Sequence, residues 1–297
     1  MARPQFAYVY AVFPPLFWSG NFLIARIMRH DIPPIQMSFW RWTLALLFLL
    51  PFAAARFRGQ GAQIRKELPF LLVLGAVGIT AFNCFLYSAM HYTTVVNASL
   101  INSLMPVVCF LFALLLLHER LRPQQIGGVM GAMLGAALII ARGDISTLAS
   151  LALNRGDLLV IGGLTFWAAY TVLIRWRPTK LPILVFLATT IAIGAVFHLP
   201  LVAWELYQVG GFALDAASAA SILYFAIFPS LLAYVLWNKA VAAIGPGRTG
   251  MYMYLMPVFG AVLGVWLLGE AFLVCHLAGI TMIFAGITLV NRAPRPR

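Results

Sequence analysis

Long apolar runs alternate with short segments rich in charged residues, glycine and proline along the whole chain. Each run has about the 20 residues that a helix needs to cross a hydrocarbon core of about 30 Å. The pattern predicts an all-α polytopic membrane protein with ten transmembrane helices. These helices are expected near residues 6–28, 34–54, 68–90, 94–117, 124–141, 157–176, 181–203, 217–239, 249–268 and 271–291.

The two halves of the chain repeat the same residues at matching positions. Trp18 and Arg26 are matched at equal spacing by Trp167 and Arg175. Further matches lie 151 residues apart. Leu104-Met105-Pro106 corresponds to Leu255-Met256-Pro257, Glu119 to Glu270 and Gly135 to Gly286. We therefore expect two five-helix repeats, residues 1–142 and 143–297. Because five is odd, the second repeat enters the membrane from the opposite side and the repeat is inverted.

Composition and charge agree with a membrane location. Apolar residues make up 63% of the chain and charged residues 9%, which excludes a soluble globular domain. The 20 Lys and Arg outnumber the 8 Asp and Glu, and they lie mainly between apolar runs, where membrane topology explains them better than nucleic-acid binding does. With the N-terminus inside, 15 loop Lys and Arg fall on the inner side and four on the outer side. Both termini are therefore expected in the cytoplasm.

The chain shows no catalytic or metal-binding pattern. The five histidines are scattered, no H-E-x-x-H or phosphate-binding loop occurs, and His118 does not face its neighbour Glu119 on a helix. We expect no enzymatic activity, no metal and no cofactor. No acidic residue lies near the centre of a predicted helix, which favours facilitative over ion-coupled transport. Arg41 does lie inside a predicted helix, and either a functional contact or snorkelling toward the headgroups explains it.

Prolines interrupt the fourth and ninth predicted helices at equivalent positions. Pro106 and Pro257 have no N–H to donate, which frees the carbonyls of Asn102 and Met253. Broken helices at matching positions of two repeats are typical of the central site of an inverted-repeat carrier. The two prolines are therefore candidates for helix breaks and gating, with a simple packing kink as the alternative.

Aromatic and amide side chains gather in the middle of equivalent helices. Asn is costly in hydrocarbon without a partner, so these faces are expected to point inward and line a cavity. Such a cavity suits a flat apolar group stacked on rings, an ammonium group at ring faces and carbonyls, and a carboxylate at amide and hydroxyl donors. Core packing or a lipid-interface belt is the alternative for each aromatic residue. The candidate substrate-binding residues are Trp18, Asn21, Asn83, Tyr87, Asn102, Ser103, Trp167, Tyr170, Tyr234, Trp237 and Tyr252.

Glycines recur at helical spacing in the fifth and ninth predicted helices. They are Gly127, Gly131 and Gly135 in the fifth, and Gly260 and Gly264 in the ninth. Such ridges let helix backbones approach closely. Since ten helices offer many partners within one chain, we expect intrachain packing and favour a monomer over a dimer.

The stretch from Ser88 to Arg142 resembles the EamA domain of the drug/metabolite transporter superfamily. The resemblance lies in Leu104-Met105-Pro106, in Leu116-Leu117-His118-Glu119-Arg120-Leu121 and in the Gly-rich helix that follows. The stretch from Leu255 to Asn291 resembles the same domain again. Within that superfamily the chain is similar to YddG-type aromatic amino acid exporters, notably in Phe17-Trp18-Ser19-Gly20-Asn21. The chain departs from the usual motif at His118 and at Ala271-Phe272.

The resemblance implies a ten-helix carrier of the bacterial inner membrane with a central cavity, alternating access and export as its direction. Together with the candidate cavity it predicts export of amino acids, aromatic and apolar ones preferred, with planar cationic drugs as further substrates. One alternative is a proton-coupled exporter of drugs or metabolites. A second alternative is a membrane enzyme that acts on a lipid-linked substrate. The lipid bilayer is the expected partner and nucleic acid is not.

Overall fold

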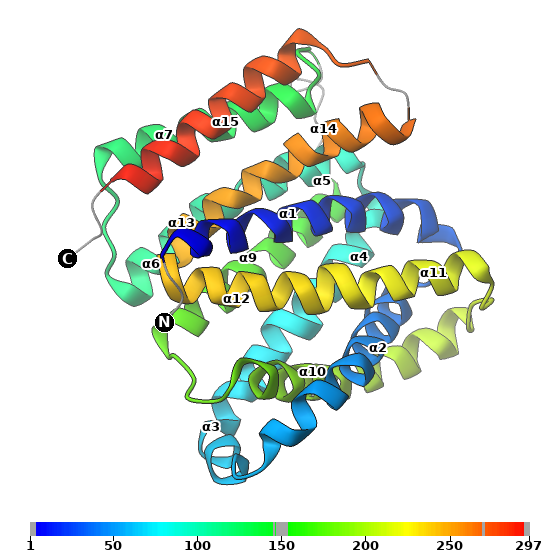
Figure 1. Ribbon diagram of the computed structural model, residues 1–297. Helices are drawn as coiled ribbons and strands as arrows, with labels where there is room; N and C mark the ends of the chain where they lie inside the picture. Colours follow the sequence, from blue (N-terminus) through cyan, green and yellow to red (C-terminus); the bar gives the residue numbers. More distant parts are fainter. Residues whose placement is uncertain (1–3, 145, 147–153, 269–270, 294–297) are drawn as a thin grey trace.

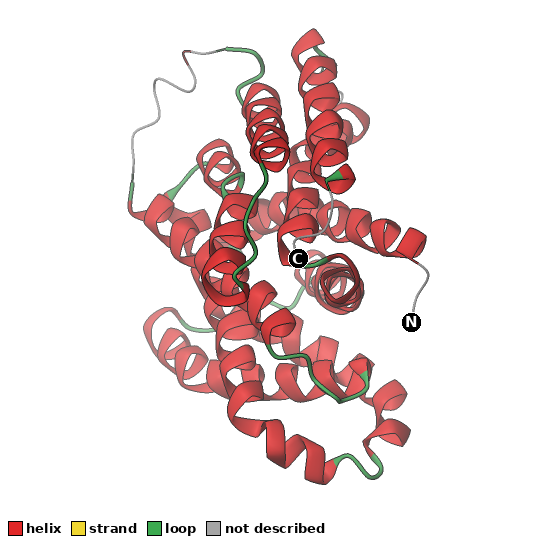
Figure 2. Ribbon diagram, turned by 90° about the vertical axis from the view of Figure 1, so that its left-hand side faces the viewer, coloured by secondary structure: helices red, strands yellow, loops and turns green. Residues whose placement is uncertain are grey.

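The fold is helical throughout the part of the chain that can be described. The computed structural model describes residues 4–144, 146, 154–268 and 271–293, and within these ranges it contains helices and connections but no strand (Figures 1 and 2). The prediction of an all-α polytopic membrane protein is confirmed. Nine segments in these ranges are long and apolar enough to cross a membrane: Pro34–Phe57, Gly61–Tyr92, Val96–Leu117, Pro123–Ile140, Arg155–Trp176, Ile183–Val209, Ala216–Ile244, Pro246–Trp266 and Val274–Arg292.

The first helix, α1 (Pro4–Ile27), has the length of a span but is not among these nine segments. Pro14, Pro15 and the polar residues Ser19 and Asn21 lower its apolar content. It nevertheless packs inside the bundle, against α12 (Ala233–Ile244) and α14 (Leu255–Leu268) (Figure 1). The count of ten transmembrane helices therefore stays a prediction.

The remaining helices follow one another with short connections. In the first half they are α2 (Pro34–Ala54), α3 (Gly61–Leu74), α4 (Phe82–Tyr92), α5 (Val95–Asn102), α6 (Met105–Leu117) and α7 (Pro123–Ile140). In the second half they are α9 (Arg155–Trp176), α10 (Ile183–Val209), α11 (Ala216–Phe225), α13 (Pro246–Met251) and α15 (Val274–Arg292). Helices from the two halves interleave, since α4 packs on α9, α2 on α10 and α7 on α15.

Irregular helical turns occur at equivalent positions of the two halves. A π-helix, η3 (Gly75–Ala81), joins α3 to α4, and a second one, η4 (Ala226–Leu232), joins α11 to α12 at a displacement of 151 residues. Likewise α5 breaks before α6, and α13 passes through the 3-10 helix η5 (Tyr252–Tyr254) into α14. These matching interruptions support two repeats in which the helices break at the same positions. The inversion of the repeat and its bounds, 1–142 and 143–297, stay predictions.

Glycines bring α7 and α15 into close contact along the upper edge of the bundle (Figure 1). A Cβ atom at Gly128 would lie 2.7 Å from the carbonyl oxygen of Gly286, and one at Gly135 would lie 2.6 Å from that of Gly279. A Cβ at Gly127 would meet nothing within 4 Å. The close-packed ridge of α7 therefore consists of Gly128 and Gly135, and it pairs helices of one chain. Whether the protein is a monomer stays a prediction.

Candidate functional site

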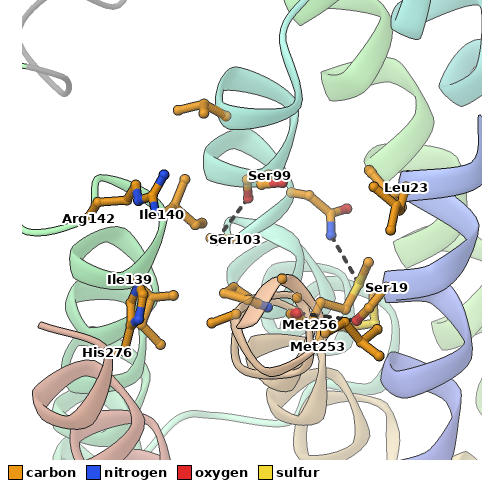
Figure 3. Close-up of a pocket in the computed structure, with 18 residues that line it drawn as sticks. Ser19, Leu23, Ser99, Ser103, Ile139, Ile140, Arg142, Met253, Met256 and His276 are labelled. Atoms are coloured by element: carbon orange, nitrogen blue, oxygen red, sulfur yellow. Dashed lines mark hydrogen bonds between the residues drawn. The ribbon is translucent and has the colours of Figure 1, made fainter. Parts of the chain in front are cut away.

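A cavity of about 300 Å³ lies between α1, α5, α7, α14 and α15 (Figure 3). Most of its wall is apolar, with Phe22, Leu23 and Ile139 among the contributors. This combination of a small volume, an apolar wall and a few polar groups is typical of a site for a small metabolite. The polar and charged residues in the wall are Ser19, Ser99, Asn102, Ser103, Arg142 and His276.

The two broken helices form the part of the wall around Asn102 and Met256. α5 ends at Asn102, whose Nδ2 donates to Met256 Sδ at 3.6 Å. Ser19 Oγ shares its proton between the carbonyl of Pro15 at 2.7 Å and that of Met256 at 3.2 Å, and the second contact connects α1 to the start of α14. Asn102, Ser103 and Pro257 from the predicted set thus line the cavity. The helix breaks place the polar side chains of Asn102 and Ser103 at its wall.

Five other predicted residues form an aromatic cluster, defined as Trp18, Trp167, Tyr170, Tyr234 and Trp237. The ring centre of Trp167 lies 5.1 Å from that of Trp18, 5.3 Å from Tyr170 and 5.1 Å from Tyr234. All five side chains are buried and none lines the cavity. In this conformation the aromatic cluster is a packed core next to the cavity, and a substrate contact for it stays a prediction.

Hydrogen bonds fasten the aromatic cluster to both π-helices. Trp18 Nε1 donates to the carbonyl of Pro229 in η4 at 3.0 Å, and the Tyr234 hydroxyl donates to the carbonyl of Gly78 in η3 at 2.7 Å. A π-turn interrupts the regular ladder of helical hydrogen bonds, and here Trp18 and Tyr234 donate to one carbonyl in each π-helix. Trp167 Nε1, in contrast, has no partner among the described residues.

We expect Trp18→Phe to destabilise the protein more than Trp167→Phe does. The first substitution leaves a buried carbonyl of η4 without its donor, which costs about 1–3 kcal/mol. The second removes an N–H that has no partner, so only packing is lost. Thermal unfolding of the purified variants in detergent measures both effects, and equal losses would contradict this assignment.

Arg41 is the centre of a second buried group, the Arg41 cluster, defined as Arg41, Asn21, Asn83, Tyr87 and Ser230. Its Nε donates to Ser230 Oγ at 2.8 Å, and its Nη1 donates to Asn83 Oδ1 at 3.1 Å and to the Tyr87 hydroxyl. The Tyr87 hydroxyl in turn donates to Asn21 Oδ1 at 2.8 Å. Arg41 is 2% exposed, so it does not snorkel to the headgroups. Its hydrogen bonds join α1, α2, α4 and η4.

The last two residues of the predicted set lie elsewhere. Tyr252 accepts a hydrogen bond from Asn291 Nδ2 at 3.0 Å and packs near α15, away from the cavity. Pro106 is buried in the first turn of α6, where Gly250 of α13 approaches it. Their roles in binding and gating stay predictions.

A smaller cavity of about 90 Å³ lies beside the connection between α6 and α7. Glu119 lines it together with Arg175 and Arg248, so one carboxyl from the first half faces two guanidinium groups from the second. Burial, the largest influence, raises the pKa of the Glu119 carboxyl, while Arg175 and Arg248 act in the opposite direction. Its repeat counterpart Glu270 lies outside the described residues.

We expect the unfolding temperature of Glu119→Gln, compared with that of the wild type at the same pH, to increase as the pH rises. A carboxyl whose pKa is raised in the folded chain binds its proton more tightly there than in the unfolded chain. Its contribution to stability therefore falls as the pH rises from the ordinary value of 4.5 through the raised value. Unfolding temperatures of both proteins across this interval test the point. A difference that does not change with pH would count against it.

The model of the EamA-like transporter family matches residues 5–141 and 154–292, two copies that cover almost the whole chain. The chain belongs to the EamA-like transporter family. The resemblance found in the sequence motifs is thereby confirmed. This EamA-like transporter is a multi-pass membrane protein that moves small molecules, and it is not an enzyme.

Curated relatives of this EamA-like transporter share its length. It is 27% identical to the "Uncharacterized transporter YyaM" of Bacillus subtilis over 92% of this chain and 89% of that one. It is 29% identical to a "Probable terminal-alkyne amino-acid exporter" of Streptantibioticus cattleyicolor, over 93% and 90%. Identity to a "Probable amino-acid metabolite efflux pump" of Salmonella typhimurium is 23%, over 91% and 89%. A protein of known crystal structure shares the fold, with a TM-score of 0.78, 20% identity and 96% coverage of both chains.

Several cavity residues of this EamA-like transporter escape the sequence pattern. Met253 and Met256 both precede Pro257 and line the cavity, and their closeness to the proline is the signal that points to them. Arg142 and His276 stand at helix ends, where a basic residue is ordinary. The packing of α7 and α15 beside α14 brings both residues to the wall of the same cavity.

Proposed function

We propose that this EamA-like transporter exports amino acids with apolar side chains, aromatic ones included, across the bacterial inner membrane. The observation that carries the proposal is the cavity of about 300 Å³, which combines an apolar wall with a few polar groups. Two relatives are named for amino-acid export or efflux, which supports the same substrate class. An amino acid with an apolar side chain presents both kinds of surface to such a wall.

The proposed mechanism is alternating access with both termini in the cytoplasm. In the predicted topology, the end of α7 and the beginnings of α5 and α15 face the outer side, and all three border the cavity. At the predicted inner side, Glu119 of one half faces Arg175 and Arg248 of the other. Rocking of the two repeats about their broken helices would exchange the open and closed sides.

The proposed transport is facilitative. Among the described residues, none that lines the cavity is acidic. Buried carboxyls elsewhere serve as structural acceptors: Glu205 binds the N–H groups of Ile35 and Gln36, and Asp157 binds Thr93. A cavity without a carboxyl offers no acidic site for a coupling proton. The proton-coupled exporter is the alternative that the experiment below also tests.

Counterflow of labelled phenylalanine into liposomes that contain the purified protein tests the proposal. We expect saturable uptake that unlabelled apolar and aromatic amino acids compete, and that persists without a proton gradient. Absence of saturable uptake by well-folded protein would overturn the proposed substrate class. Strict dependence on the gradient would overturn the facilitative mechanism in favour of proton coupling.

A further inference from the structure

Asn102 is a buried amide in the wall of the cavity, at the break between α5 and α6. It is 8% exposed and lines the cavity. Its Nδ2 donates to Met256 Sδ at 3.6 Å, and its Oδ1 accepts no hydrogen bond from the described residues. A thioether is a weak acceptor, so no strong hydrogen bond holds either end of this amide. Since buried amides are normally well paired, Asn102 is available to a ligand.

The second repeat carries no amide at the matching position. The displacement of 151 residues relates Asn102 to Met253, and both residues line the cavity. In Figure 3, Met253 lies in the same part of the wall as Met256. One broken helix thus presents a polar group to the cavity, and the other presents two thioethers, which suit apolar partners. This difference orients a molecule that is polar at one end and apolar at the other.

We propose that Asn102 binds the zwitterionic end of the substrate, with Nδ2 donating to the carboxylate and Oδ1 accepting from the ammonium group. The proposal rests on the proposed function and specifies how the cavity selects among apolar molecules. An amide offers a donor and an acceptor side by side, and an α-amino acid carries their two partners on one carbon atom. Both hydrogen bonds are charge-assisted, so they are stronger than the one to Met256 Sδ. The flexible Met256 side chain can release the donor while the helix stays in place.

Two hydroxyl groups of the same wall already use their protons. Ser19 Oγ donates to the carbonyls of Pro15 and Met256, and Ser103 Oγ donates to the carbonyl of Ser99 at 3.0 Å. Neither hydroxyl can donate to a carboxylate without giving up a backbone acceptor. Of these three polar side chains, Asn102 has the donor that is held most weakly.

Competition of phenylalanine counterflow in liposomes tests the contact on the wild-type protein. The competitor 3-phenylpropionate keeps the carboxylate and lacks the amine, while phenethylamine keeps the amine and lacks the carboxylate. Each analogue loses one of two charge-assisted hydrogen bonds, so we expect each to compete about tenfold more weakly than unlabelled phenylalanine. Competition by either analogue as strong as that by phenylalanine would overturn the proposal and leave the proposed transport intact.

Asn102→Leu then identifies the residue. Leucine has nearly the same shape and leaves only the weak acceptor Met256 Sδ without its donor, so the variant is expected to fold. We expect it to weaken the binding of phenylalanine about a hundredfold and that of each analogue about tenfold, because phenylalanine loses two contacts and each analogue loses one. The three ligands should then bind alike. A loss of equal size for all three would show that Asn102 only shapes the cavity, and it would overturn the proposal.

Two further variants serve as controls. Met256→Leu removes the sulfur and keeps the amide, so it should still discriminate phenylalanine from both analogues. Loss of this discrimination would assign the effect to the contact between Asn102 and Met256 and overturn the contact with substrate. Gln124→Leu removes an amide hydrogen bond from α7 to Leu289 of α15, at an exposed position that does not line the cavity. It should match the wild type with all three ligands.

Calorimetric binding to the purified protein in detergent separates this proposal from the proposed function. Phenylalanine that binds with the expected discrimination but is not transported would overturn the proposed function alone. Transport with the same discrimination in the wild type and in Asn102→Leu would overturn the role of Asn102 alone. Absence of both transport and binding by the folded protein would overturn both.

Discussion

Gly260→Phe is expected to weaken the binding of phenylalanine in the counterflow assay roughly tenfold to hundredfold while the protein remains folded. Gly260 lines the cavity on α14, and a Cβ atom placed there meets nothing within 4 Å. A side chain can therefore leave the helix here without a clash at its Cβ atom, and we expect a phenyl ring to occupy part of the cavity. Forcing a substrate into the same space costs about 1–3 kcal/mol or more, which corresponds to a loss of binding of roughly tenfold to hundredfold.

Gly131→Phe is the matched control for this substitution. Gly131 also lies in a helix, and a Cβ atom placed there meets nothing within 4 Å, but Gly131 does not line the cavity. Both substitutions replace a helical glycine by the same better helix former, which by itself changes stability by roughly 0.5 kcal/mol or less in either variant. Counterflow and unfolding temperature are measured for both variants. If Gly260→Phe transports as well as Gly131→Phe, the substrate does not pass through this cavity.

Much of the helical layout follows from the sequence because membrane helices depend on long apolar runs. The fifth predicted helix, expected near 124–141, is observed as α7 at Pro123–Ile140, with Pro123 at its first turn. The π-helices η3 and η4 do not follow in the same way. A π-turn inserts one residue into a helix, and no change in apolar pattern accompanies Gly75–Ala81 or Ala226–Leu232.

The candidate site is harder to derive because neighbouring residues on a helix point in directions about 100° apart. Trp18 and Ser19 are adjacent on α1, yet Trp18 packs in the aromatic cluster and Ser19 lines the cavity. A repeat indicates which helices surround the centre, but it does not fix their rotation. Only the packing of α1 against α12 on one side and α14 on the other decides which face meets the cavity.

Arg41→Lys is expected to destabilise the protein by about 3 kcal/mol, although it keeps the charge. Arg41 donates in two directions at once, from Nε to Ser230 on η4 and from Nη1 to Asn83 and Tyr87 on α4. A lysine has one ammonium group and cannot occupy both positions. The charge would stay in the membrane interior with fewer partners, which is the costly arrangement. Thermal unfolding in detergent measures the loss, and wild-type stability of Arg41→Lys would contradict this account.

Arg41→Met separates the charge from the hydrogen bonds. Methionine fills much of the volume and removes the buried cation, so no ion is left without partners, and the remaining cost is the donor lost by the buried acceptors such as Asn83 Oδ1. We therefore expect Arg41→Met to be more stable than Arg41→Lys. Because Arg41 does not line the cavity, Arg41→Met should keep the half-saturation concentration of the wild type for phenylalanine. A large increase in that concentration would show that Arg41 contributes to substrate binding as well as to the packing of the core.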